Sequence, residues 1–152
     1  MKAIAKTIAA ATLLISGSAV AGVVAPGDVQ FVDAAVPVSL TGVAGDPAKG
    51  REWFANRKLG NCLACHANDD LAEEQFHGEI GPYLEGIGDT YTEAELRAIV
   101  INSKEVFGDA TIMPAFYKTD GLNRVAKKFA GKTILSAEQV EDIVAYLATL
   151  KE

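Results

Sequence analysis

The stretch Cys62-Leu63-Ala64-Cys65-His66 holds the residues whose types and spacing could do chemistry. Two thiols separated by two residues, with an imidazole directly after the second, have the spacing at which a c-type haem is attached. Each sulfur can form a thioether with one haem vinyl group, and the histidine can then bind the iron. The motif predicts one covalent haem c, held by Cys62 and Cys65, with His66 as a ligand of the iron.

A pair of cysteines at this spacing has three other interpretations. A thioredoxin-like dithiol normally lies near a βαβ pattern, and no such pattern follows here. A zinc site would need further ligands, but the sequence has no second CxxC and no HxxxH to complete four. A disulfide stays open because the chain looks exported. The histidine directly after the second cysteine favours the haem over these alternatives.

Met113 is the residue we expect to be the second axial ligand of the iron. It is the only methionine after the first residue, and Pro114 follows it. A thioether is neutral and soft, so it favours Fe(II) and raises the reduction potential relative to a second imidazole. The proline removes an amide donor and stiffens the loop that presents the sulfur. Filling a gap in the core is the commoner role of a methionine in general.

His77, the only other histidine, is the alternative second ligand. It lies in an acidic loop, where a surface histidine is the ordinary interpretation, and as a ligand it would lower the reduction potential. Whichever residue binds, an iron with both axial positions filled by the protein has no open site for substrate. This favours electron transfer over chemistry at the iron.

Residues 1–21 have the pattern of a secretory signal peptide. Lys2 and Lys6 give a basic start, residues 3–15 are mostly apolar, and Ala19 and Ala21 form an A-x-A arrangement. The apolar run is too short to span a bilayer. We therefore expect cleavage after Ala21 and a soluble protein outside the cytoplasm, in a bacterial periplasm.

The chain without this segment is acidic. Residues 22–152 contain 12 Lys or Arg and 20 Asp or Glu, a formal net charge of −8. Such a charge disfavours nucleic acid and anionic membrane as partners, and it favours a partner with a basic patch at its docking site. A cluster of basic residues nevertheless lies in the connection 118–135, at Arg124, Lys127, Lys128 and Lys132.

The remaining pattern predicts an all-α domain over residues 46–152, preceded by an arm at 22–45. Asp46-Pro47 starts a helix at 48–58, and capping boxes at Thr92 and Ser136 start helices that run to Asn102 and Lys151. The arm is apolar without a helical period. It is interpreted either as a flexible tail or as a segment that lies along a partner subunit.

These motifs together resemble the class I cytochromes c. The matching residues are Gly50 and Phe54, the CxxCH motif, Gly81-Pro82 with Leu84, Met113-Pro114, and Tyr146-Leu147. The resemblance implies an all-α fold around one covalent haem, with the first and last helices crossing near the glycine. It also implies that the carbonyl of Pro82 accepts a hydrogen bond from His66 and so fixes its tautomer.

Four longer stretches resemble the SoxX family, the monohaem subunits of SoxAX complexes in sulfur-oxidising bacteria. They are residues 60–66, 77–82, 111–117, and 131–135 leading into 139–147. The resemblance implies a heterodimer with SoxA, an L-cysteine S-thiosulfotransferase that couples thiosulfate oxidatively to a cysteine of the carrier SoxYZ. This chain would accept the released electrons and pass them to a downstream cytochrome c, with the substrate chemistry on SoxA and no catalytic residue of its own.

Two other functions remain as alternatives. A free-standing cytochrome that shuttles electrons fits the haem motif equally well, although such a shuttle needs neither the apolar arm nor the long connection. A haem sensor or peroxidase-like enzyme would need an iron ligand that dissociates, which a bound Met113 makes slow.

Overall fold

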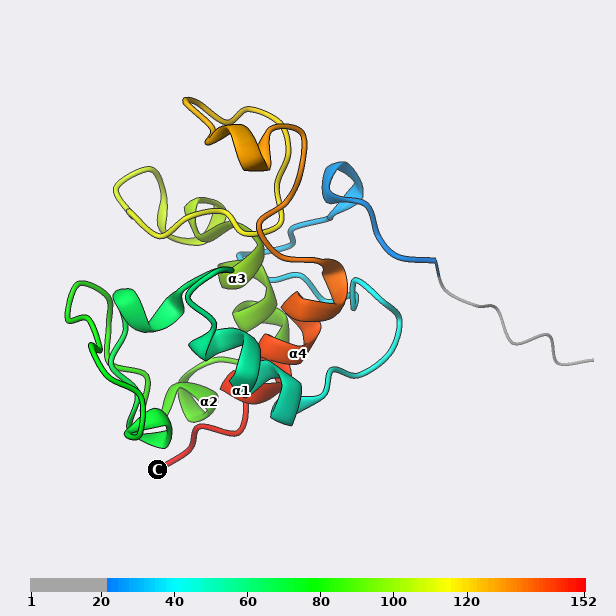
Figure 1. Cartoon of the computed structure of the whole chain (residues 1–152). Coiled ribbons are helices and arrows are strands. Elements are labelled where there is room, and N and C mark those ends of the chain that lie inside the picture. The colour runs from blue at the N-terminus through cyan, green and yellow to red at the C-terminus, as the bar shows by residue number, and fades with distance from the viewer. Residues whose placement is uncertain (1–21) are drawn as a thin grey trace, which may run out of the picture.

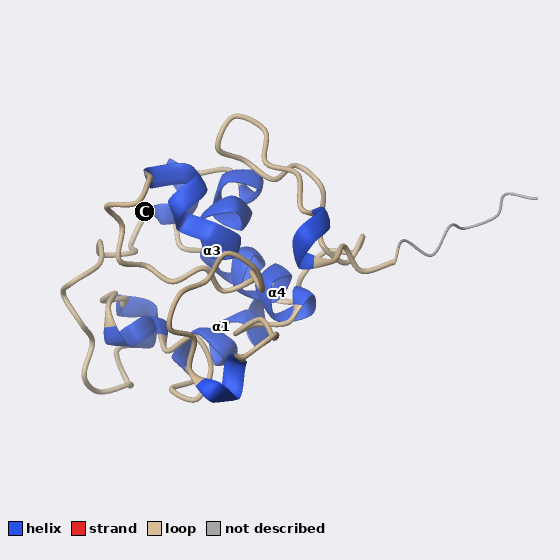
Figure 2. Ribbon diagram, turned by 90° about the horizontal axis from the view of Figure 1, so that it is seen from above, coloured by secondary structure: helices blue, strands red, loops and turns tan. Residues whose placement is uncertain are grey.

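A computed structural model describes residues 22–152, and the predicted signal peptide at 1–21 lies outside the described residues. Four α-helices form within the described part: α1 (Pro47–Ala55), α2 (Ile87–Thr90), α3 (Glu93–Phe107) and α4 (Ala137–Leu147). Four 3₁₀ turns join them, namely η1 (Pro26–Asp28), η2 (Cys62–Ala64), η3 (Asp69–Leu71) and η4 (Lys127–Phe129). Figures 1 and 2 show the helices gathered at the centre, with long loops around them. The predicted all-α fold is confirmed.

The helix starts follow the predicted caps. Asp46 Oδ1 accepts hydrogen bonds from the backbone N–H groups of Ala48 and Lys49, at 2.9 and 3.3 Å, and Pro47 occupies the first turn. Thr92 and Ser136 each form a complete capping box. These side chains satisfy N–H groups that would otherwise lack partners at a helix start.

The predicted helix ends are less accurate than the starts. α1 ends at Ala55 rather than at residue 58, because Asn56 already has an extended backbone with φ −73° and ψ 107°. α4 ends at Leu147 rather than at Lys151, where the chain continues in tighter turns closed by Thr149 N–H on the Tyr146 carbonyl. α3 extends past Asn102 to Phe107, although Asn102 itself is not helical.

The crossing of α1 and α4 is the centre of the fold (Figure 1). Gly50 lets the two backbones approach: a Cβ built there would lie 1.9 Å from the carbonyl oxygen of Asp142 and 2.7 Å from Cβ of Tyr146. Beside it, the rings of Phe54 and Tyr146 pack edge to face with centroids 5.8 Å apart. The indole Nε1–H of Trp53 donates to Asp142 Oδ2 at 3.1 Å.

Substituting Gly50 with alanine is expected to destabilise the protein by at least about 1–3 kcal/mol, the usual cost of overpacking a core. The added methyl group would overlap backbone atoms of α4, so one helix has to move. Gly27→Ala is the matched control, because a Cβ there would have no neighbour within 4 Å. Urea unfolding of the two variants and wild type measures the difference. Equal stability of all three would contradict the crossing.

The segment 22–45 packs on its own domain. Val36 and Leu40 are 2% and 0% exposed, and the Val36 N–H donates to the carbonyl of Ala94 at 2.9 Å. Within the arm, Val24 N–H donates to the Leu40 carbonyl at 2.8 Å, and Tyr117 Oη donates to the Val24 carbonyl at 2.8 Å. The interpretation as a flexible tail is therefore wrong, and the buried residues are not available to a partner subunit.

A buried ion pair locks this segment in place. Arg97 on α3 contacts Glu141 on α4 through both carboxylate oxygens, at 2.8 and 2.9 Å. Arg97 Nη1 also donates to the Val36 carbonyl, and Glu141 Oε1 accepts the Leu40 N–H. The pair thus joins α3, α4 and the arm.

No helix in the described part of the chain has the length and apolarity of a membrane span.

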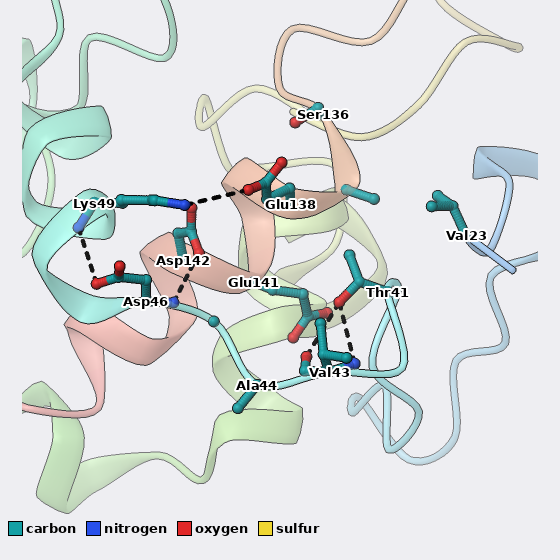
Figure 3. A pocket seen from close by; sticks show the side chains of 12 residues that line it. Val23, Thr41, Val43, Ala44, Asp46, Lys49, Ser136, Glu138, Glu141 and Asp142 are labelled. Atoms are coloured by element: carbon teal, nitrogen blue, oxygen red, sulfur yellow. Dashed lines mark hydrogen bonds and ion pairs between the residues drawn. The ribbon is translucent and has the colours of Figure 1, made fainter. Parts of the chain in front are cut away.

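A pocket of about 480 Å³ lies between the arm and the starts of α1 and α4 (Figure 3). Its polar lining is mostly acidic, with Lys49 paired to Glu138 at 3.5 Å and Asp142 Oδ1 accepting the Asp46 N–H at 2.7 Å. None of the predicted haem-site residues lines it. This pocket is therefore separate from the CxxCH motif.

Candidate haem site

The CxxCH motif forms a tight turn shortly after α1. The N–H groups of Cys65 and His66 both donate to the Cys62 carbonyl, at 3.1 and 3.0 Å, as η2 (Cys62–Ala64) closes. Asn61 enters this turn with φ 51°, in the left-handed region that asparagine tolerates. Both cysteines are half-buried and free of any disulfide. Burial raises the pKa of Cys62 to about 12, so its thiol is neutral near pH 7.

The His66 ring is held from one side by the Gly81-Pro82 turn. Its Nδ1 lies 2.7 Å from the carbonyl oxygen of Pro82. A carbonyl only accepts, so Nδ1 carries the proton and the lone pair of Nε2 remains for another partner. The Gly81 N–H donates to the Cys65 carbonyl at 2.7 Å, and a Cβ on Gly81 would lie 2.5 Å from His66 Cε1. Only glycine lets this turn pass so close to the ring.

Gly78 provides a second close crossing over the same motif. Its N–H donates to the Leu63 carbonyl at 2.7 Å, and a Cβ there would lie 2.0 Å from the Ala64 carbonyl oxygen. This contact could not be predicted from the sequence, because a glycine in a polar loop is typical of any turn. Residues 78–82 therefore run directly across the CxxCH turn and fix it.

Met113 is presented by a loop that the end of α3 holds. Asn102 interrupts α3 with φ −157° and ψ 92°, and Ser103, which is fully buried, donates its Oγ–H to the Met113 carbonyl at 2.9 Å. Thr111 Oγ1 accepts the Met113 N–H at 3.3 Å. The Met113 side chain is half-buried and packs against the core. Ser103 could not be predicted to have this role, since a serine late in a helix carries no signal for it.

The loop with Met113 meets the CxxCH motif at Gly60. A Cβ on Gly60 would lie 3.2 Å from Cε1 of Phe116 and 3.4 Å from Sγ of Cys62. The aromatic ring and the sulfur therefore flank the same glycine. The structure thus brings Cys62, Cys65, His66 and Pro82 together directly, and the Met113 loop reaches them through Phe116.

His77 has a structural role in this structure. Its Nδ1 accepts the Asn68 N–H at 3.3 Å, and its Nε2 faces the Leu71 carbonyl at 3.1 Å, to which it donates. Both ring nitrogens are therefore used by the backbone. This arrangement leaves no lone pair of His77 for a metal, which favours Met113 over His77 as the second ligand.

The donor set fits a covalently attached haem. It offers two free thiols, an imidazole with Nδ1 already engaged and Nε2 available, and a thioether on a separate, anchored loop. Both cysteines are free, so both sulfurs are available for thioether bonds. No group of three or more His, Cys, Asp or Glu side chains that could hold a metal ion occurs among residues 22–152.

A polar network ties the loop after the motif to α4. Tyr146 Oη donates to Asp70 Oδ2 at 2.8 Å and accepts from Asn68 Nδ2 at 2.9 Å, while Arg51 Nε donates to the same Asp70 oxygen at 2.8 Å. Burial acts to raise the pKa of Asp70, but the hydrogen bonds from Tyr146 and Arg51 outweigh it and lower this pKa. Burial and the Asp70 contact raise the pKa of Tyr146.

Asp70→Asn is expected to destabilise the protein at pH 7 by up to about 1 kcal/mol, a small value because the pair is half-exposed. The pKa of Asp70 is depressed in the folded state, so its stabilising effect is present above the ordinary value of 3.8 and is lost as the pH falls through the folded value. Urea unfolding should therefore separate the variant from wild type at pH 7 and bring them together at strongly acidic pH. A difference that grows in acid would contradict this.

Comparison with known proteins places the chain in a family. The cytochrome c family matches residues 47–151. Among solved structures, a chain in the crystal structure of SoxXA from P. pantotrophus is 47% identical to it, with 86% of this chain and 99% of that chain covered and a TM-score of 0.79. The search of curated proteins found no match. With Cys62 and Cys65 at the spacing for a covalent haem c, this chain belongs to the cytochrome c family.

Proposed function

We propose that this chain is the monohaem electron-transfer subunit, of the SoxX type, of a periplasmic SoxAX complex. The observation that carries the proposal is the 47% identity to a chain of SoxXA, over nearly the whole length of that chain. The candidate site supports it, because Cys62, Cys65, His66 and an anchored Met113 loop offer the donors that a covalent haem needs.

Each residue of the candidate site has a role in this proposal. Cys62 and Cys65 would hold the haem through thioether bonds, and His66 Nε2 and the Met113 sulfur would bind its iron. Pro82 fixes the tautomer and orientation of His66 through its carbonyl, 2.7 Å from Nδ1. Ser103 anchors the backbone that carries Met113. When bound, the haem supplies a one-electron Fe(III)/Fe(II) couple.

The chain's own part is to keep both axial positions filled and the ligands in place during electron transfer. The turn beside the His66 ring is held by the Gly81 N–H, which donates to the Cys65 carbonyl, and the Met113 loop is held by the Ser103 hydroxyl, which donates to the Met113 carbonyl. Small geometric changes between oxidation states lower the cost of transferring an electron, and a rigid ligand shell serves that end. With His66 and Met113 both bound to the iron, this chain would leave no site for thiosulfate there, and the thiosulfate chemistry would belong to the partner.

The partner in this proposal is SoxA, with which the chain forms a heterodimer. SoxA couples thiosulfate to a cysteine of SoxYZ, which releases two electrons, and this chain takes them one at a time and passes them to a downstream cytochrome c. Residues 1–21 direct export to the periplasm and are removed, residues 22–45 form the arm, and residues 46–152 form the haem domain.

Purification of the tagged chain from its native host tests the proposal. A second haem protein should copurify in equal amount, and the haem of this chain should become reduced when thiosulfate and the carrier protein are added. A monomer that carries haem, donates electrons freely and recruits no second haem protein would instead identify a free-standing shuttle. The arm no longer argues against a shuttle, because it packs on its own domain.

A further inference from the structure

The segment 118–132, called here the basic loop, differs in charge from the rest of the chain. It carries five Lys or Arg and one Asp, a net charge of +4, at Lys118, Asp120, Arg124, Lys127, Lys128 and Lys132. The remainder of residues 22–152 carries seven Lys or Arg and 19 Asp or Glu, a net charge of −12. The positive charge of this acidic protein is therefore concentrated in one place.

The cations of the basic loop are free to meet another molecule. Arg124, Lys127, Lys128 and Lys132 are exposed, and none of them forms an ion pair with a carboxylate of the described chain. Figure 1 shows the loop, in yellow and orange, standing clear of the helices. Folding alone gives no reason for grouping these charges, since like charges that lie close together repel.

The base of the basic loop lies beside the candidate haem site. The N–H groups of Ile134 and Leu135 both donate to the Phe116 carbonyl, at 3.0 and 3.1 Å, so the loop leaves and returns at one residue. Phe116 and the Cys62 sulfur both lie close to Gly60. The base of the basic loop therefore adjoins the predicted haem attachment site, where an electron would enter or leave.

The surface of the loop mixes cations with apolar side chains. Leu122 and Val125 are 41% and 38% exposed, and Lys128 Nζ lies 4.6 Å from the centre of the Phe129 ring. Exposed apolar groups with positive charges around them are typical of a protein docking surface. A membrane or a nucleic acid presents extended negative charge, which the −12 of the remaining chain would repel. A protein with a local acidic patch avoids that repulsion.

We propose that the basic loop is the docking surface for a redox protein whose own redox centre is surrounded by acidic side chains. This inference rests on the proposed electron-transfer function. The net charge of the whole chain favours a different partner, namely one with a basic patch at its docking site. The charge of the basic loop favours a partner with an acidic patch instead. The local charge beside the haem, rather than the total, selects the partner.

Electron-transfer rates with two small oxidants of opposite charge test the inference. The reduced holo-protein, with any subunit that copurifies, is mixed with ferricyanide, a trivalent anion, or with tris(phenanthroline)cobalt(III), a trivalent cation. The variant Lys127→Gln/Lys128→Gln is compared with the control Lys49→Gln/Lys151→Gln. Both variants remove two positive charges, and the control pair lies at the start of α1 and beyond the end of α4.

We expect the rate with ferricyanide to fall as salt increases, and the loop variant to lower the low-salt rate by roughly threefold to tenfold. The control variant should leave that rate within about twofold of wild type, and the cationic oxidant should show the opposite trend in the loop variant. The same loop variant should slow transfer to a copper protein with an acidic face, used as the protein probe.

Two results would overturn the inference. In one, the loop and control variants change the ferricyanide rate equally, so that only total charge matters. In the other, the holo-protein binds vesicles of anionic phospholipid and the loop variant abolishes the binding, which would assign the loop to a membrane surface. A haem that neither oxidant can oxidise would contradict the proposed electron-transfer function instead, so the two failures are distinguishable.

Discussion

Replacing Arg97 with methionine is expected to lower the free energy of unfolding by about 3–5 kcal/mol, the largest effect expected of a single substitution in this chain. The Arg97 and Glu141 side chains are only 7% and 4% exposed. Removing the guanidinium leaves the Glu141 carboxylate buried with the Leu40 N–H as its remaining partner, and it removes the donor to the Val36 carbonyl. We therefore expect the arm to become more mobile in the variant, in addition to the loss of stability.

Urea unfolding measures the stability, and limited proteolysis near residues 36–40 measures the loosening of the arm. The exposed pair of Lys49 and Glu138 supplies the control, because Lys49→Met should cost no more than about 1 kcal/mol. The double variant Arg97→Met/Glu141→Leu should recover much of the loss, since it buries no unpaired charge. A loss below about 1 kcal/mol for Arg97→Met would show that the pair is not buried as described.

Gly81→Ala is expected to have the largest effect on the haem site without removing a ligand. The new methyl group would lie 2.5 Å from Cε1 and 2.7 Å from Nδ1 of His66, so the ring has to move away from the Pro82 carbonyl. Losing a partner that orients a metal ligand typically costs 10–100-fold in metal affinity, or about 1.4–2.8 kcal/mol. The bond between His66 and the iron should weaken by that factor.

The weakening is measured as the urea concentration at which the low-spin spectrum of the haem gives way to a high-spin spectrum. The variant should make this change well before the backbone unfolds, whereas wild type should lose ligation and structure together. Gly27→Ala again serves as the control, because its Cβ would meet nothing within 4 Å. If Gly81→Ala kept the ligation of wild type at every concentration, the close packing of this turn on His66 would be wrong.

Local signals in the sequence predicted most of the fold. A cap depends on residues within one turn of each other, so Asp46, Thr92 and Ser136 mark helix starts that the structure confirms. The CxxCH motif is equally local, and its turn is closed by contacts within itself. Helix ends depend on competing contacts farther away, which explains why α1 and α4 are shorter than predicted.

The parts that sequence could not predict all depend on contacts between distant segments. The arm has no periodicity of its own, and its place is fixed by Arg97 and Glu141, which lie far along the chain. The break at Asn102 and the bond from Ser103 to Met113 exist only because the loop returns to the helix. Gly78 and Gly81 lie directly against the CxxCH turn, where a larger side chain would not fit. The composition of the sequence does not reveal such contacts.

We propose that this chain relays single electrons from a thiosulfate-oxidising partner through a haem held at Cys62, Cys65, His66 and Met113. The decisive experiment is rapid mixing of the oxidised complex, purified from its host, with thiosulfate and the carrier protein, with the haem of this chain followed by its absorbance. We expect this haem to be reduced within the time of one turnover, and Met113→Leu to change both its spectrum and the rate of reduction. Turnover with this haem oxidised throughout, or an unchanged spectrum in Met113→Leu, would contradict it.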